Sequence, residues 1–530
     1  FLVGTGVTIG VAGVATFRSG RIDVNDALNN AGFGANSLDS LTTGAGNIAI
    51  GQDALTANTT GNNNIAIGKN ALDASTTQNR SIAIGVNALS GANAAYNIAI
   101  GYEALLADTT GNINIAIGDE AMTANTTGAE NVAVGNYALD ANTTASQNTA
   151  IGTYALTDNT TGASNVAVGY RALFDNTTAS HNTALGYYAL YANTTGSENT
   201  AFGSNSAVTN TTGIKNVSVG AWSLRYNTTG ANNTGVGYQA LNANTTADNN
   251  TAFGYNTLQA NTTGTQNTVV GALAADAVTT GSNVTAMGYL AASAVTTGGR
   301  ITALGVAAVN TSTSANDLTG VGYQALSGNT SGERNTGIGD EALYTNTTAS
   351  DNTAVGHNSL KLNTTGTYNT SVGSFSLSTN TTTSDCTAVG YGALYSNTAN
   401  YNTALGAYAL YLTSTGANNT AVGRNSLRVN TTGTRNTAVG YGALDANTTS
   451  NDNTAVGNMA LSANTAAHNN SAFGHSSLEA NTTGYHNIAI GNYALQNNST
   501  GIQNTALGYS ALTANTTANE KSPMATLLLP

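Results

Sequence analysis

The chain has 530 residues, of which only 8% are charged and 40% are hydrophobic, and its formal net charge is −12. The few Lys and Arg residues are scattered, which argues against nucleic-acid binding, and no run approaches the ~20 apolar residues of a membrane helix. The single cysteine, Cys386, excludes an intrachain disulfide.

Residues 1–30 precede the regular part of the chain. They include the stretch FLVGTGVTIGVAGVATF, which glycines interrupt and which has no charged leader. A secretory signal peptide would need such a leader. We therefore expect residues 1–30 to form a strand-rich attachment or cap segment.

Residues 31–519 consist of a repeat whose closing glycine recurs with a regular spacing of seventeen, as at Gly51, Gly68 and Gly85. The series continues to Gly508, and only the intervals that end at Gly101 and Gly406 are one residue shorter. With Gly34 the series gives about 29 coils. Self-similarity at a fixed period is the signature of a solenoid, in which each unit packs on its neighbours.

The repeat reads Asn-(Ile/Val/Thr)-Ala-(Ile/Val/Leu/Phe)-Gly, two variable residues, (Ala/Ser)-Leu, two variable residues, Asn-Thr-Thr-Gly and two variable residues. We number these positions 1 to 17. Position 4 is always apolar from Ile50 to Leu507, and position 9 is nearly always Leu. We expect positions 4 and 9 to form the core.

Glycine, β-branched residues and Asn-Thr-Thr in every unit are unfavourable for a helix. The pattern instead predicts a strand of about five residues at Asn-x-Ala-x-Gly and a turn at Asn-Thr-Thr-Gly, where Gly or Asn could take positive φ. In stacked coils the Asn and Thr side chains would form ladders. The two prolines, Pro523 and Pro530, both follow the last repeat, as expected if every backbone N–H is needed for pairing.

The polar second half of the coil favours a thin two-strand roll over a three-sided β-helix, which needs an apolar residue on each side. The strand Ile48-Ala49-Ile50 carries apolar or small residues on both faces. A strand with one face in water would alternate, so we expect another chain to cover the outer face. Between Ala272 and Ser314 smaller residues replace the leucines, and Val278 and Val295 replace the turn Asn, which predicts a narrowing or bend of the rod.

The phrases NIAIG and NTAVG, followed by a small residue and leucine, resemble the head repeats of trimeric autotransporter adhesins. The longer unit NTAVGYGALDANTTS is similar to repeat fibres of phage tails. The resemblance implies a parallel left-handed β-roll in an intertwined or side-by-side homotrimer, located outside the cell. The fold class that we predict is an all-β parallel β-solenoid of about 29 coils. Residues 520–530 form a short tail that resembles neither an adhesin anchor nor a phage-fibre chaperone domain.

Tyrosine recurs at position 6, directly after the glycine. These rings could form an intermittent aromatic stripe that stacks on sugars, or they could shield the edge of the core by packing across strands. The residues are Tyr102, Tyr170, Tyr187, Tyr238, Tyr255, Tyr289, Tyr323, Tyr391, Tyr441 and Tyr509.

No constellation of catalytic or metal-binding residues stands out. The acidic pairs Asp119-Glu120 and Asp340-Glu341 resemble the two carboxylates of a glycan hydrolase, but neighbouring strand residues point to opposite faces. The histidines are dispersed without metal-ligand spacing; they are His181, His357, His468, His475 and His486. We therefore predict no catalytic residues, no cofactor and no metal.

These features predict an extracellular structural fibre, not an enzyme, that projects from a virion or cell and attaches it to a surface. A phage tail fibre is the favoured form, and a bacterial surface adhesin or matrix filament is the alternative. A glycan-degrading tailspike and an ice-binding solenoid are less favoured. The predicted partners are two further copies of the chain and a cell-surface glycan or other receptor.

Overall fold

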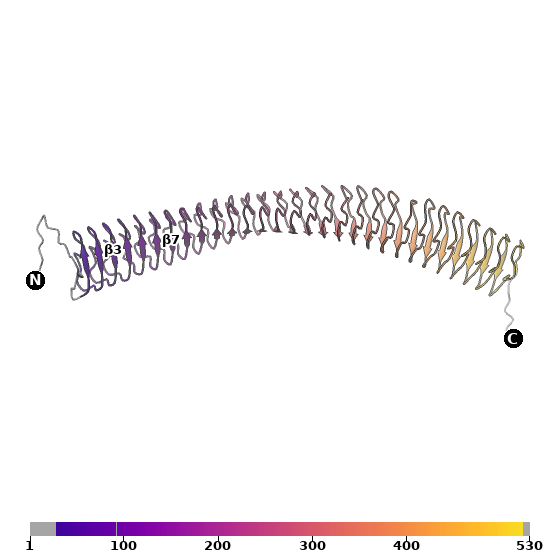
Figure 1. Ribbon diagram of the computed structural model, residues 1–530, viewed down its shortest axis with the longest axis horizontal. Coiled ribbons are helices and arrows are strands. Elements are labelled where there is room, and N and C mark those ends of the chain that lie inside the picture. Colours follow the sequence, from indigo (N-terminus) through magenta and orange to yellow (C-terminus); the bar gives the residue numbers. More distant parts are fainter. Residues whose placement is uncertain (1–27, 92, 523–530) are drawn as a thin grey trace, which may run out of the picture. The chain divides into compact units, whose positions relative to one another are not determined.

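The computed structural model describes residues 28–91 and 93–522, and every regular element among them is a β-strand. The chain divides into two units, Phe1–His181 and Asn182–Pro530. Figure 1 shows one strand in each coil, β3 and β7 among them. Each unit is a parallel β-solenoid, so the predicted all-β solenoid fold is confirmed for both.

The described residues of the first unit contain nine strands. They are β1 (Ala31–Phe33), β2 (Ile48–Ile50), β3 (Ile65–Ile67), β4 (Ile82–Ile84), β5 (Ile98–Ile100), β6 (Ile115–Ile117), β7 (Val132–Val134), β8 (Thr149–Ile151) and β9 (Val166–Val168).

The second unit contains the remaining twenty strands of the described residues. They are β10 (Thr183–Leu185), β11 (Thr200–Phe202), β12 (Val217–Val219), β13 (Thr234–Val236), β14 (Thr251–Phe253), β15 (Thr268–Val270), β16 (Val284–Met287), β17 (Ile301–Leu304), β18 (Leu318–Val321), β19 (Thr336–Ile338), β20 (Thr353–Val355), β21 (Thr370–Val372), β22 (Thr387–Val389), β23 (Thr403–Leu405), β24 (Thr420–Val422), β25 (Thr437–Val439), β26 (Thr454–Val456), β27 (Ser471–Phe473), β28 (Ile488–Ile490) and β29 (Thr505–Leu507).

Strands of successive coils pair in parallel with equivalent positions opposite each other, as Ile65 does with Ile82. The two shorter coils keep this register, since Ile82 lies opposite Ile98 and Thr387 lies opposite Thr403. The missing residue is therefore absorbed outside the strand. Each strand has three or four residues, and turns and bends form the rest of every described coil. The prediction of two strands per coil is wrong.

The core of a coil consists of positions 3, 8 and 9. In the coil that begins at Asn64, Ala66, Ala71 and Leu72 are fully buried, whereas Ile67 at position 4 is half-exposed. The prediction for position 9 is confirmed, and the prediction that position 4 lies in the core is wrong. Side chains alternate between the two faces of a strand. Because the alanine at position 3 points inward, the larger residues at positions 2 and 4 must point outward.

Two buried Asn ladders run through the polar side of the coil. Asn131, at position 1, donates from its backbone N–H to Oδ1 of Asn114 in the preceding coil (3.0 Å) and from Nδ2 to the carbonyl of Ala145 (3.0 Å). Asn142, at position 12, donates from Nδ2 to the same carbonyl (3.1 Å) and to Oδ1 of Asn125 (2.8 Å). Buried amides need such partners. The predicted Asn ladders are confirmed, and these bonds also close each coil around the carbonyl at position 15.

The threonines of the turn differ from each other. Thr126 at position 13 donates its hydroxyl to the backbone carbonyl of Thr143 in the next coil (2.9 Å), whereas Thr127 at position 14 is exposed. The Thr ladder therefore joins hydroxyl to carbonyl, and only one of the two threonines takes part.

Glycine at position 5 is required by two features of the backbone. Gly135 has a φ of 136°, and a Cβ atom there would lie 2.6 Å from the carbonyl oxygen of Gly152 in the next coil. That distance leaves no room for a methyl group, and the backbone conformation is one that only glycine adopts readily.

The other positive φ angles do not lie in the predicted turn. Tyr137, Leu139 and Gln147 at positions 7, 9 and 17 have φ values of 57°, 55° and 63°, whereas Gly128 at position 15 has no positive φ. The prediction that the Asn-Thr-Thr-Gly turn uses positive φ is wrong. The left-handed conformation of a leucine lowers the free energy of unfolding by roughly 1–2 kcal/mol. Complete burial of its side chain raises it by about 2–3 kcal/mol, so burial offsets the strain.

The coils around Ala272–Ser314 replace both Asn ladders with apolar residues. The strands β16, β17 and β18 are one residue longer than the others because position 1 joins the strand. The replacing residues are all buried; they are Val278 and Val295 at position 12, and Val284, Ile301 and Leu318 at position 1. The substitutions at position 1 were not predicted from the sequence. They restore some of the apolar volume that is lost where Ala275, Ala292 and Val309 replace the leucine of position 9. The predicted narrowing stays a prediction.

Parts of both terminal segments lie outside the described residues. The predicted cap at 1–30 is described only from residue 28, and the tail at 520–530 only as far as residue 522. Asn30 already behaves as position 1, since it is buried and donates from Nδ2 to the carbonyl of Gly44 (2.9 Å). The first described coil therefore begins at Asn30.

Candidate ligand-binding surface

The ten tyrosines at position 6 all lie on the surface, with exposures from 39% at Tyr170 to 60% at Tyr509. Two of them in successive coils of the second unit stack directly: the rings of Tyr238 and Tyr255 have centroids 5.7 Å apart and an interplanar angle of 9°. Most other coils place a different residue type at position 6. The stripe is therefore intermittent, as expected.

Aromatic residues at positions 7 and 10 share this surface, which we call the aromatic face. In the first unit, the ring of Tyr154 at position 7 packs edge-on against the ring of Phe174 at position 10 of the next coil, with ring centroids 6.1 Å apart. The guanidinium of Arg171 lies over both rings. Positions 7 and 10 were not predicted from the sequence. The sequence signal for them is that aromatic residues recur three positions apart in neighbouring coils. The left-handed backbone at positions 7 and 9 brings these side chains together.

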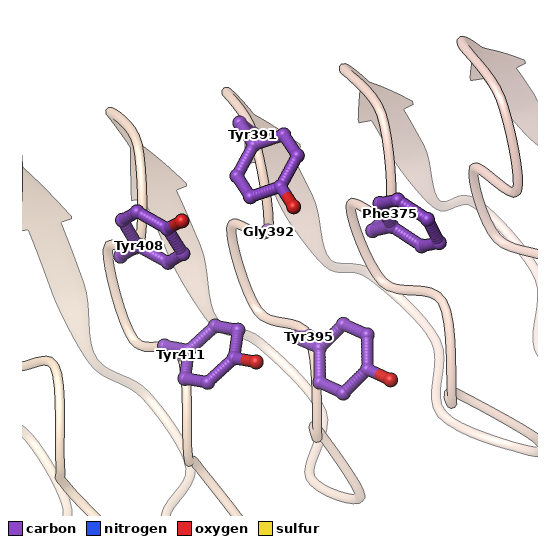
Figure 2. A pocket seen from close by; sticks show the side chains of 6 residues that line it. All are labelled: Phe375, Tyr391, Gly392, Tyr395, Tyr408 and Tyr411. Atoms are coloured by element: carbon purple, nitrogen blue, oxygen red, sulfur yellow. The ribbon is translucent and has the colours of Figure 1, made fainter.

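The densest part of the aromatic face is a hollow of about 230 Å³ in the second unit. Figure 2 shows its side chains, which project from three successive coils. The lining residues are Phe375, Tyr391, Gly392, Tyr395, Tyr408 and Tyr411. We call this group the aromatic hollow.

The rings of the aromatic hollow hold one another in place. Tyr395 and Tyr411 stack at 5.1 Å with an interplanar angle of 19°. The ring of Tyr408 packs edge-on against the rings of Tyr391 and Tyr411, with centroid distances of 5.3 and 5.4 Å. The ring of Phe375 packs edge-on against that of Tyr391, with centroids 6.0 Å apart. Offset and edge-to-face pairs of this kind are favourable beyond their buried area. The result is a preformed set of ring faces with phenol hydroxyls between them.

Gly392 leaves space in the aromatic hollow. It stands at position 7, where other coils have longer side chains, and a Cβ atom there would lie 3.3 Å from the ring of Tyr411. Its φ of 60° also suits asparagine, which occupies position 7 in many coils. The absence of a side chain at Gly392 therefore gives the hollow its depth.

A second, polar hollow of about 310 Å³ adjoins the first and shares Tyr408 and Tyr411 with it. Its other lining residues are Arg424, Asn425 and Arg428. Arg428 donates from Nε to Asp445 (2.8 Å), whereas Arg424 makes no ion pair with any residue that the structure describes. Arg424 thus places an uncompensated positive charge beside the aromatic hollow.

Burial, followed by the nearby phenols of Tyr395, Tyr391 and Tyr408, raises the pKa of Tyr411 above its ordinary value. The phenol is therefore neutral at physiological pH. A neutral phenol can both donate and accept a hydrogen bond, so the wall shared by the two hollows offers polar contacts as well as a ring face.

The acidic pairs singled out in the sequence are engaged by neighbouring side chains. Glu341 lies 2.5 Å from Nζ of Lys361, and Asp340 lies 3.7 Å from Nε2 of His357. In the first unit, Glu120 accepts a hydrogen bond from the Tyr137 hydroxyl at 3.4 Å. Each pair is thus linked to side chains of the next coil.

Throughout 28–91 and 93–522, no three His, Cys, Asp or Glu side chains cluster closely enough to hold a metal ion. Over the same ranges no helix has the length and hydropathy needed to cross a membrane.

The fold and this surface define a repeat solenoid with a local aromatic and cationic patch. No protein-family model, no curated protein and no solved structure matches the chain.

Proposed function

We propose that the chain is the shaft of an extracellular homotrimeric fibre that attaches a virion or a cell to a surface, with a phage tail fibre as the favoured form. The observation that supports this proposal best is the outer face of the strands. Position 4 is apolar in every described coil and is nowhere buried. Phe202, Phe253 and Met287 are each at least half exposed.

This apolar row is far longer than the isolated patches of ordinary soluble chains. In the second unit it follows twenty strands, which at about 4.8 Å per strand extend over roughly 90 Å. Exposed apolar surface on that scale marks an interface. Since every coil presents the same row, the simplest partner is another copy of the chain in the same register, as closed homo-oligomers require.

The polar surface suits a chain that works outside the cell. Asn and Thr provide most of the exposed polar groups, and backbone carbonyls are already bonded within the stack. Each coil depends mainly on its two neighbours, so length can be extended without a change of fold. A uniform shaft with a local binding patch is what attachment at a distance needs.

Two other function classes receive less support. A glycan-degrading tailspike needs two carboxylates across a scissile bond, and the pairs Asp119-Glu120 and Asp340-Glu341 are instead linked to side chains of adjacent coils. An ice-binding face needs flat threonine arrays. Of the two turn threonines, Thr126 donates its hydroxyl internally and Thr127 is exposed. The outward threonines at position 2, such as Thr251 and Thr268, lie beside the apolar residues of position 4.

The proposal is tested by placing charges on the apolar row. Val422→Asp together with Val439→Asp puts carboxylates at position 4 of two adjacent coils, and we expect chemical crosslinking to yield a monomer in place of a trimer. Thr432→Asp with Thr449→Asp, at the exposed position 14 of the same coils, is the matched control and should still crosslink as a trimer. Equal trimer yield from both double variants would contradict the proposal.

A further inference from the structure

Building on the proposed function, we infer that the aromatic hollow and the polar hollow together bind an acidic glycan. A pyranose ring stacks against the tyrosine faces, and its carboxylate meets Arg424. The site extends over the coils that contain β21, β22, β23 and β24, all in the second unit. Besides Tyr391, the side chains that we assign to the ligand are those of Tyr395, Tyr408, Tyr411 and Arg424.

The shape of the aromatic hollow suits a sugar ring. A pyranose has an apolar C–H face and a rim of hydroxyl groups, so it needs an aromatic platform edged with hydrogen-bonding groups. Tyr395 and Tyr411 form a stacked pair, and Tyr391 and Tyr408 stand edge-on beside it. These four phenols supply both requirements, in a site that is mostly apolar with a few oriented polar groups.

Charge selects the kind of sugar. Arg428 is held by Asp445, whereas the guanidinium of Arg424 has no acidic partner among the described residues. The chain as a whole has a net charge of −12, so the guanidinium of Arg424 is a local positive charge on an acidic chain. Planar guanidinium groups bind carboxylates in a bidentate manner, and a quaternary cation, the usual ligand of an aromatic cage, would be repelled.

The test uses the intact chain and immobilised polygalacturonate, hyaluronate and polysialic acid, with neutral galactan as the uncharged comparison. We expect at least one acidic polymer to bind with an affinity that falls as salt rises, and galactan to bind much more weakly. Arg424→Gln should weaken acidic binding by about tenfold to a hundredfold, the range of a hydrogen bond to a charged group. Arg435→Gln, which removes the same charge elsewhere in the second unit, should leave it unchanged.

Filling the hollow gives a second variant with a close control. Gly392→Asn places the commonest position-7 side chain into the aromatic hollow and should weaken binding about tenfold or more. Gly442→Asn makes the same substitution at the same coil position in the coil after the polar hollow, at a φ of 62° compared with 60° at Gly392. Gly442→Asn should bind as the unmodified chain does. Both variants keep every ladder. A Cβ at Gly442 would lie 2.8 Å from Sδ of Met459, whose flexible side chain can move aside, so folding is not expected to separate the two variants.

The outcomes distinguish the site from the fibre proposal. Loss of binding in Gly392→Asn and Arg424→Gln, with trimer mass retained in both, supports the inference. If none of the acidic polymers binds while the chain is still a trimer, the inference is overturned and the fibre proposal stands. Equal binding of galactan, or capture of a proline-rich peptide in place of any polymer, also overturns it, because either result assigns the rings to a different ligand. Binding by a monomeric chain would support the site and contradict the fibre.

Discussion

A carboxylate replaces one Asn of the position-12 ladder, and its substitution tests the energetic role of that ladder. Asp108 is fully buried and accepts hydrogen bonds from the backbone N–H of Gly111 (3.0 Å) and from Nδ2 of Asn97 (3.0 Å) and Asn125 (3.1 Å). Unlike asparagine it cannot donate when ionised. Burial outweighs these hydrogen bonds and raises the pKa of Asp108 from 3.8 to about 7.

The direction of the pH effect follows from the raised pKa. The folded state holds the proton more tightly than the unfolded state, so folding is most stable below pH 3.8, loses stability as pH rises through the interval up to about 7, and is constant above it. Since one pKa unit corresponds to about 1.4 kcal/mol, the loss between pH 5 and pH 8 is on the order of 2–3 kcal/mol. Asp108→Asn should remove this loss and add a donor toward the carbonyl of Gly111.

Because a solenoid opens locally, amide hydrogen exchange of peptides from 97–125 is the appropriate assay. We expect these peptides to exchange more slowly in Asp108→Asn than in the unmodified chain. The ratio of the two protection factors should be on the order of fiftyfold greater at pH 8 than at pH 5. Asn125→Asp should create the same pH dependence one coil further on. A protection ratio that is equal at the two pH values would refute the reasoning.

Three further predictions concern other parts of the fold. Gly440→Ala, whose Cβ would lie 2.4 Å from the carbonyl of Gly457 at a φ of 136°, should cost about 2–4 kcal/mol and lower the thermal midpoint. A Cβ at Gly433 would also lie 2.4 Å from a carbonyl oxygen, that of Ser450, but Gly433 has no positive φ. Because Ala467 occupies the same position 15 in the sequence, Gly433→Ala should cost less than Gly440→Ala, and equal midpoints would contradict this account of position 5. Thr413 is a buried position-12 residue whose hydroxyl has no partner among the described residues. Thr413→Asn should raise the free energy of unfolding by about 1 kcal/mol, as measured by urea unfolding. A lower free energy of unfolding would show that the Asn ladder does not extend to this coil. Deletion of residues 436–452 removes one whole coil and should leave the chain folded. Deletion of residues 438–440 breaks the strand register and should prevent assembly. Identical thermal midpoints for the two deletion variants would show that register is unimportant.

The repeat made the fold accessible from the sequence. A constant period, glycine at position 5 and the absence of proline from the coils were enough to predict in-register parallel strands, and the Asn ladders followed from their periodic recurrence. The core was harder to predict, since alanine at position 3 and isoleucine or valine at position 4 are both apolar. Only the direction of the strand face distinguishes them, and apolar residues on both faces of a strand give no alternation from which the inward face could be predicted.

The candidate site could be predicted only in part. Tyr391 was visible as a member of the position-6 series, but Tyr395, Tyr408 and Tyr411 occupy positions whose proximity depends on left-handed residues such as Leu394 and Leu410. Leucine rarely adopts that conformation, so neither propensity nor alternation indicates it. Gly392 carried no signal either, because the space it leaves is defined by rings from the neighbouring coil.

The apolar row at position 4 makes self-association the central claim, and the mass of the chain in solution tests it most directly. Sedimentation equilibrium over a wide dilution series should give three times the 53.0-kDa chain mass, independent of concentration down to the lowest measurable level. A mass of 53.0 kDa at every concentration would show that the row at position 4 is stable in water without a second copy and would contradict the account.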